Sequence, residues 1–228
     1  MISSSPIKNI LFCGYRDWSL KIHQKIVAWN PKKFAIDIAT SKATLSKKIK
    51  EKTYDAILFI GWSWIVPEET IKSNLCICMH PSPLPKYRGG SPIQHQIING
   101  EKDTSITLFI MDDEIDHGPI IWQEPISLSG NLNKVLNRIT QISTEAIQET
   151  LLRFHRQNGL DGIEQEHHHA TYFKRRKPEE SEIKVEDFLN FSAEELYNKI
   201  RALQDPYPNA FITCKNNTKL FLKESNYE

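Results

Sequence analysis

The chain lacks any long apolar segment. Its longest apolar stretches are short enough to be single β-strands, and residues 1–8 are too polar for a signal peptide. The sequence therefore predicts a protein that neither spans a membrane nor takes a membrane as its partner.

Cysteine is scarce as well. The four cysteines, at positions 13, 76, 78 and 214, include no CxxC pair and no series with metal-ligand spacing. Cys76 and Cys78 are two positions apart in an expected strand, and extended spacing holds their α-carbons near the upper limit for a disulfide. These observations predict a reduced, cytoplasmic protein without a metal site.

An excess of charge of one sign is also missing. Lys and Arg total 29 and Asp and Glu total 28, which leaves a formal net charge of +1. No strongly basic face is implied, and this argues against a nucleic-acid partner. The 228 residues are enough for one α/β core with a small appendage.

Apolar and amphipathic segments alternate through the first two thirds of the chain. Strands are expected over residues 9–15, 33–40, 55–61, 75–79, 104–111 and 120–128. Helices are expected over residues 18–29, 42–52 and 132–157, with shorter helices starting near Pro67 and Ser91. This order predicts an α/β fold with a doubly wound, Rossmann-like, mostly parallel sheet, in which ligands bind beyond the carboxyl ends of the strands.

The last part of the chain differs in pattern. A polar connection over residues 159–177 leads to a helix over residues 192–203, whose Ser192 and Glu195 match a capping box. Two strands around residues 216–217 fit a β-hairpin. We therefore expect a larger domain over residues 1–177 and a small helix and hairpin subdomain over residues 178–228. An exposed hairpin edge also suits pairing with a second copy, as in a homodimer.

Two stretches carry side chains suited to chemistry. Residues 79–90 place His80 at a strand end, followed by three stiffening prolines and two glycines that let the backbone approach a ligand. Residues 111–118 contain four acidic side chains beside His117, and such an acid can serve as a general base. Alone, the two stretches indicate an α/β enzyme with a His/Asp site, while a structural histidine and a solvated acidic turn would give the same pattern.

Two other groups of residues have plainer interpretations. Adjacent side chains in an extended run face alternate sides and rarely bind one metal, so residues 167–169, three consecutive histidines, are expected to form a solvated strand. Trp62, Trp64 and Trp122 are expected to pack in the core, which is the commoner fate of tryptophan.

The two stretches together resemble the signature of the folate-dependent formyltransferases. The run from His80 to Gly89, followed by Ile115-Asp116-His117-Gly118, is similar to the family pattern of Asn-x-His, Ser-Leu-Leu-Pro, Arg-Gly and then Asp-x-Gly. Asp116 also follows His80 at the separation that the family leads one to expect. The family includes methionyl-tRNA, glycinamide ribonucleotide and sugar N-formyltransferases. The resemblance covers residues 9–128 well, and it is weaker at residues 173–178 and 201–208.

The resemblance implies a reaction and a set of contacts. N10-formyltetrahydrofolate would be the co-substrate, and a primary amine would accept its formyl group. His80 would stabilise the oxyanion and Asp116 would collect the proton of the amine, both within a catalytic domain over residues 1–177. Contacts to the reduced folate would come from Gly61, Trp62, Leu84, Asp112 and Ile115. Contacts to the acceptor would come from Gly14, Tyr15, Arg16, Lys86, Arg88 and Gly89.

One catalytic position departs from the family pattern. Cys78 stands where the family has an asparagine that donates a hydrogen bond to the oxyanion, and a thiol is a poorer donor. Losing one such donor costs about a hundredfold in rate. Three interpretations follow: another donor such as His80 takes over, the enzyme is slow, or the protein binds ligands without catalysis. The intact His80, Asp116 and loop favour the first, and the folate route needs no nucleophilic Cys78.

The acceptor is the least determined part of the expectation. Balanced charge argues against tRNA. The run over residues 88–94 and the missing asparagine resemble a subgroup of sugar N-formyltransferases tied to nonulosonates such as pseudaminic acid. The expected acceptor is thus a nucleotide-linked amino sugar, UDP-linked 4-amino-4,6-dideoxy-N-acetylhexosamine in that subgroup. A methionyl-tRNA formyltransferase-like enzyme and a non-catalytic folate or nucleotide-sugar binder remain the alternatives.

Overall fold

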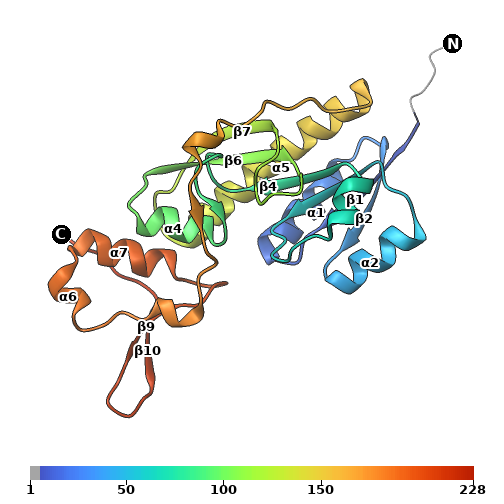
Figure 1. Ribbon diagram of the computed structural model, residues 1–228. Coiled ribbons are helices and arrows are strands. Elements are labelled where there is room, and N and C mark those ends of the chain that lie inside the picture. The colour runs from blue at the N-terminus through green and yellow to red at the C-terminus, as the bar shows by residue number, and fades with distance from the viewer. Residues whose placement is uncertain (1–5) are drawn as a thin grey trace.

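The computed structural model describes residues 6–228, and residues 1–5 of the N-terminal stretch considered above for a signal peptide lie outside it. A six-stranded sheet of order β2-β1-β3-β4-β6-β7 forms its centre (Figure 1). Four neighbouring strands are parallel: β1 (Lys8–Cys13), β2 (Phe34–Ala39), β3 (Ala56–Ile60) and β4 (Cys76–His80). The antiparallel strands β6 (Asp103–Ile110) and β7 (Ile120–Ser127) extend the sheet beyond β4. The predicted mostly parallel α/β sheet is therefore confirmed.

Helices cover both faces of the sheet. Helices α1 (Asp17–Trp29) and α5 (Leu132–Gln157) pack against each other on one face, and α2 (Lys42–Glu51) contributes to a second apolar cluster on the other. Short helices α3 (Glu68–Ser73) and α4 (Pro92–Ile98) lie in the connections on either side of β4. Among the described residues, no helix is both long and apolar enough to cross a membrane.

Strand β4 shows how the sheet positions the site. Its alternate side chains, Ile77 and Met79, belong to the cluster beneath α1 and α5, while Cys78 packs against the cluster on the α2 side. Successive side chains of a strand point to opposite faces, so His80 points to the same face as Cys78. Because both faces of β4 are covered, the strand is apolar nearly throughout.

The C-terminal region forms a smaller body beside α4. It contains α6 (Asp187–Asn190), α7 (Ala193–Ala202), and an antiparallel pair made of β9 (Ala210–Thr213) and β10 (Lys219–Leu222). Helix α7 packs against α4, and the β9–β10 hairpin projects away from the sheet (Figure 1). The expected capping box is present, because Ser192 Oγ accepts from Glu195 N and the Glu195 carboxylate accepts from Ser192 N. The predicted helix and hairpin are confirmed.

The connection between these bodies contains elements that the sequence pattern did not predict. Strand β8 (Tyr172–Phe173) pairs in parallel with β5 (Arg88–Gly89), and a 3-10 turn, η1, spans His167–His169. The extended strand expected for the three histidines is therefore wrong. The His169 amide donates to Glu166 O, which closes the turn and brings ligand atoms of Glu166, His168 and His169 within 4.8 Å of one another, all three exposed. The second 3-10 turn, η2, spans Pro178–Ser181.

The capping box predicts a local stability effect. Replacing Ser192 by Ala removes the acceptor for the Glu195 amide, and we expect the free energy of unfolding to fall by about 1 kcal/mol in urea denaturation. Ser192→Asp, which keeps an acceptor at the same place, serves as the control and should stay within a few tenths of a kcal/mol of the unchanged protein. Equal stability of Ser192→Ala and the unchanged protein would contradict the capping role.

The burial of the cysteines predicts their reactivity. All four cysteines are free; burial raises the pKa of Cys13, Cys76 and Cys78, and the nearby Asp116 charge raises that of Cys78 further. The thiolate is the reactive form, so these three thiols should react slowly with a disulfide reagent at pH 8, while the exposed Cys214 reacts fast. A Cys214→Ser variant should lose the fast phase of the thiol reaction. Unfolding in guanidinium should expose the other three thiols to the reagent. A fast thiol surviving in Cys214→Ser would show that the cavity leaves Cys78 ionised and accessible.

Candidate active site

The structure brings together the two side chains that the sequence pattern placed in separate stretches. His80 ends β4, and its Nδ1 lies 3.5 Å from Oδ2 of Asp116, which belongs to the loop between β6 and β7. Only 7% of the His80 side chain and 14% of the Asp116 side chain are exposed. An imidazole and a carboxylate therefore meet where most of the surrounding water is excluded.

The backbone of residues 87–89 holds both members of this pair. His80 Nε2 lies 2.8 Å from the carbonyl oxygen of Tyr87. Because a carbonyl oxygen only accepts, Nε2 carries a proton and donates it, which leaves Nδ1 as the nitrogen that faces Asp116. Asp116 Oδ2 in turn accepts the backbone N–H of Gly89 over 2.7 Å.

The backbone around this pair is conformationally strained. Tyr87, Gly89, Ser91 and Asp116 have φ values of 60°, 97°, 54° and 52°, in the left-handed region that non-glycine residues seldom adopt. A Cβ added to Gly89 would lie 2.3 Å from Phe173 O, so only glycine fits there. Such conformations persist only when neighbouring contacts determine them, and they concentrate at functional sites.

A cavity of about 670 Å³ opens beside the pair. It begins at the carboxyl ends of β3 and β4 and extends over the face of the sheet that carries Phe59, Cys78 and Phe109. Its volume is typical of a small-molecule site. Nine of the expected site residues line it: Arg16, Gly61, Trp62, Cys78, His80, Gly89, Asp112, Ile115 and Asp116.

The other expected contacts lie outside the lining of this cavity: Gly14, Tyr15, Leu84, Lys86 and Arg88. Gly14 packs closely against the end of β3, since a Cβ added to it would lie 2.5 Å from Ile60 O. Leu84 is 3% exposed and belongs to the buried residues.

Arg88 is placed differently from the sequence expectation. It is 1% exposed, and its guanidinium donates to Tyr172 Oη over 2.6 Å and to Gln165 Oε1 over 2.7 Å. Its Nη2 also donates to Nδ1 of His167 over 2.9 Å. With these hydrogen bonds, the Arg88 guanidinium points into the protein and away from a ligand.

Trp62 and Trp64 line one wall of the cavity. The expected core packing is confirmed for Trp62, which also packs against the apolar cluster on the α2 side, and for Trp122, which packs against the cluster beneath α1 and α5; it is wrong for Trp64. The Trp64 ring stacks on Tyr15 with a centroid separation of 4.4 Å and meets Trp62 edge-on at 4.8 Å. Within the described part of the chain, the buried Trp62 Nε1 and Gln94 Nε2 have no hydrogen-bond partner. Buried donors of this kind are costly until an acceptor reaches them, so this wall suits a flat ring system with acceptor atoms.

A basic wall was missed by the sequence reasoning. Residues 174–177, Lys-Arg-Arg-Lys, line the cavity together with Arg16. They are held there by the β5–β8 ladder, in which the Gly90 amide donates to Phe173 O over 2.9 Å. The basic run is visible in the sequence, but only this long-range pairing places it beside His80.

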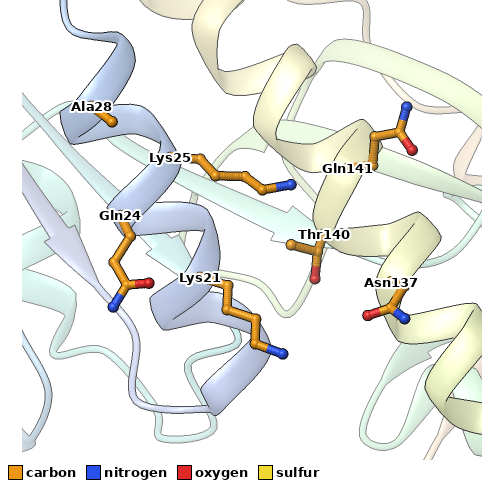
Figure 2. Close-up of a pocket in the computed structure, with 7 residues that line it drawn as sticks. All are labelled: Lys21, Gln24, Lys25, Ala28, Asn137, Thr140 and Gln141. Atoms are coloured by element: carbon orange, nitrogen blue, oxygen red, sulfur yellow. The ribbon is translucent and has the colours of Figure 1, made fainter.

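A second hollow of about 520 Å³ lies between α1 and α5 (Figure 2). Its lining consists of lysine, amide, threonine and alanine side chains: Lys21, Gln24, Lys25, Ala28, Asn137, Thr140 and Gln141. The ammonium groups of both lysines extend toward the gap between the helices (Figure 2). The lining includes neither a histidine nor an acid, so it offers no base, and the His80–Asp116 cavity remains the candidate active site.

Comparison with known proteins gives the family context of this geometry. The family model described as formyl transferase matches residues 20–151, and the model for the formyl transferase C-terminal domain matches residues 176–228. Methionyl-tRNA formyltransferase of Nostoc sp. is 30% identical over 222 residues, which cover 94% of this chain and 60% of that protein. The chain thus spans about 60% of the length of this curated relative.

Solved structures agree with the fold. Methionyl-tRNA formyltransferase from Clostridium thermocellum has a TM-score of 0.80 at 33% identity, covering 94% of this chain and 97% of that one. HypX from Aquifex aeolicus in complex with tetrahydrofolic acid (TM-score 0.78, 18% identity, 95% and 37% covered) shares the fold. So does a 4-N formyltransferase from Francisella tularensis (TM-score 0.74, 22% identity, 97% and 98% covered). The formyl transferase model, which matches more than half of the chain, shows that the chain belongs to the formyltransferase family.

Proposed function

We propose that the protein transfers a formyl group from N10-formyltetrahydrofolate to the primary amine of a nucleotide-linked amino sugar. The observation that carries this proposal is the His80–Asp116 pair, 3.5 Å apart, on the wall of a cavity of about 670 Å³ with aromatic and basic surroundings. A site of that size suits two small molecules that meet at one reacting carbon.

The aromatic wall suits the reduced folate. The pterin ring carries carbonyl and ring-nitrogen acceptors, which the unpartnered N–H groups of Trp62 and Gln94 can reach as donors. Gly61, at the end of β3, and the loop with Asp112 and Ile115 complete this side of the cavity. The likeness to the HypX complex with tetrahydrofolic acid supports the same ligand class.

The pair divides the chemistry between its two members. N10-formyltetrahydrofolate supplies the carbon that the acceptor amine attacks, and the bond from that carbon to N10 breaks in return. Asp116 accepts the proton that the amine loses, because only a neutral amine attacks. The proton then passes to N10 as its bond to the carbon breaks, so that tetrahydrofolate leaves with an N10–H group. In its doubly protonated form, with Nε2–H still held by the Tyr87 carbonyl, His80 donates the N–H of Nδ1 to the oxygen on which negative charge develops. Cys78 lines the cavity as an un-ionised thiol, because burial raises its pKa, and it contributes at most a weak donor.

The basic wall suits the diphosphate of the acceptor. The Arg16 guanidinium lies 5.1 Å from the Tyr15 ring centroid and 5.0 Å from that of Tyr207, which fixes it at the cavity. Together with residues 174–177 it supplies donors for charge-assisted hydrogen bonds to phosphate oxygens. Arg88 is left out of this acceptor site because its guanidinium is already bound within the protein.

Methionyl-tRNA is the second candidate acceptor. It is favoured by the relatives named for that activity, at 30% and 33% identity. The formal net charge of +1 and the cavity volume of about 670 Å³ favour the small acceptor instead.

The cellular setting is proposed on similar grounds. Four free cysteines suit the reducing cytoplasm. Leu220 and Phe221 of the hairpin are 57% and 53% exposed, which suits a homodimer contact.

The assigned roles predict the effect of removing either group. Asp116→Asn removes the proton acceptor and His80→Ala the oxyanion donor, so each should lower kcat at least about a hundredfold in a formyl-transfer assay. The matched control is Asp103→Asn, an exposed acid at the start of β6, which should keep its rate. Unchanged turnover in both site variants, with their folds intact by circular dichroism, would refute these roles.

The acceptor is identified by a direct comparison. The protein is incubated with N10-formyltetrahydrofolate and UDP-, dTDP- or GDP-linked amino sugars, or with charged initiator tRNA, and products are read by mass spectrometry. We expect one added formyl group on a nucleotide sugar and no formylated tRNA. Formylation of the tRNA alone, with a steep loss of rate as salt rises, would establish the second candidate. Release of formate without any amine would indicate a hydrolase instead.

A further inference from the structure

Two buried polar side chains behind the site take no direct part in the chemistry proposed above. Arg88 is 1% exposed and Gln165 is 5% exposed, and Arg88 Nη2 donates to Gln165 Oε1 over 2.7 Å. Gln165 lies outside the lining of the cavity. Burying polar groups this completely is costly unless they are hydrogen-bonded, so their partners indicate why they are there.

The amide nitrogen of Gln165 binds the backbone of the Asp116 loop. Its Nε2 donates to Asp116 O over 3.0 Å and to Gly118 O over 2.8 Å. These carbonyls flank the turn in which Asp116 has a φ of 52°. A residue in that conformation needs outside contacts to keep it, and one amide supplies two of them.

Arg88 connects the same amide to the other side of the pair. Its guanidinium binds Gln165, while its backbone neighbours are Tyr87, whose carbonyl holds His80, and Gly89, whose N–H holds Asp116. A closed ring of contacts results, from the Asp116 carboxylate through Gly89 and the Arg88 side chain to Gln165 and back to the Asp116 carbonyl. Loss of one residue of this ring would free the backbone segments that hold Asp116, which are Gly89 at its carboxylate and the turn at its own carbonyl.

We propose that Gln165 is a positioning residue, which aims the Asp116 carboxylate at His80 and the cavity by holding the peptide carbonyl groups of residues 116 and 118. The kinetic part of this inference rests on the proposed function. The geometric part does not depend on it.

Two substitutions separate the contacts of Gln165. Gln165→Met keeps an unbranched side chain of similar length and removes all three hydrogen bonds. Gln165→Glu keeps an acceptor for Arg88 and removes the N–H donors to the two carbonyls. We expect kcat to fall about ten- to a hundredfold in both, with KM for donor and acceptor changing less than about threefold. Gln157→Met, at the exposed end of α5, is the matched control and should keep the unchanged rate.

A second comparison distinguishes positioning from general loss of structure. In an Asp116→Asn background, Gln165→Glu should lower kcat by less than about twofold, because no carboxylate is left to aim. The same loss in both backgrounds would overturn the proposal. If Gln165→Met lowers the melting temperature, Gln165→Glu, which retains the Arg88 contact, decides the question.

Hydrogen exchange tests the geometry without any turnover. The Gly89 amide is protected by Asp116 Oδ2. Followed by NMR, its exchange should accelerate at least about tenfold in Gln165→Glu, while the amides of β1 keep their protection. Unchanged exchange at Gly89 would overturn the positioning role. A protein that shows no formyl transfer, yet loses Gly89 protection in the variant, would refute the proposed function and retain this inference.

Discussion

The short segment from Tyr87 to Gly89 is the constraint on which the site depends. Its Tyr87 carbonyl oxygen binds His80 Nε2 over 2.8 Å, and its Gly89 amide binds Asp116 Oδ2 over 2.7 Å. Because the carbonyl keeps a proton on Nε2 of His80, it also fixes Nδ1 as the edge of the ring that faces the carboxylate. Tyr87 and Gly89 both have positive φ values, so the segment pairs with β8 in a conformation that an ordinary strand would not adopt.

The sheet supplies a rigid support for this segment. His80 is the last residue of β4, a strand with parallel and antiparallel neighbours and apolar clusters on both faces. A catalytic group on such a strand keeps its orientation better than one on a free loop. The cavity straddles the carboxyl end of β4, with Cys78 and His80 on one side of the strand and Met79, Leu136 and Ile139 on the other, and the loop carrying Asp116 reaches it from the β6–β7 connection. The rigid strand and the Asp116 loop thus meet at one site.

Positive charge is used in two ways around the cavity. Arg88 is buried behind the pair, where its donors bind Tyr172, Gln165 and His167 and hold backbone in place. Arg16 and the run over residues 174–177 face the cavity, where the acceptor phosphates are proposed to bind. The planar guanidinium of the arginines suits both tasks, since it offers several donors in fixed directions.

The sequence by itself determined the order and type of most of the sheet and helix elements. Apolar runs of strand length and the amphipathic stripe of α5 follow from local periodicity, and the capping box at Ser192 is visible in the residues themselves. The family motif also named His80 and Asp116. What only the tertiary structure decided were contacts between distant segments. The β5–β8 pairing and burial decide where the Arg88 guanidinium points and bring residues 174–177 to the cavity. The 3-10 turn of the three histidines and the tryptophan wall likewise depend on contacts made in the folded protein. Residue type and spacing along the chain do not encode which buried acceptor a long side chain will reach, because that depends on the packing of segments brought together by folding.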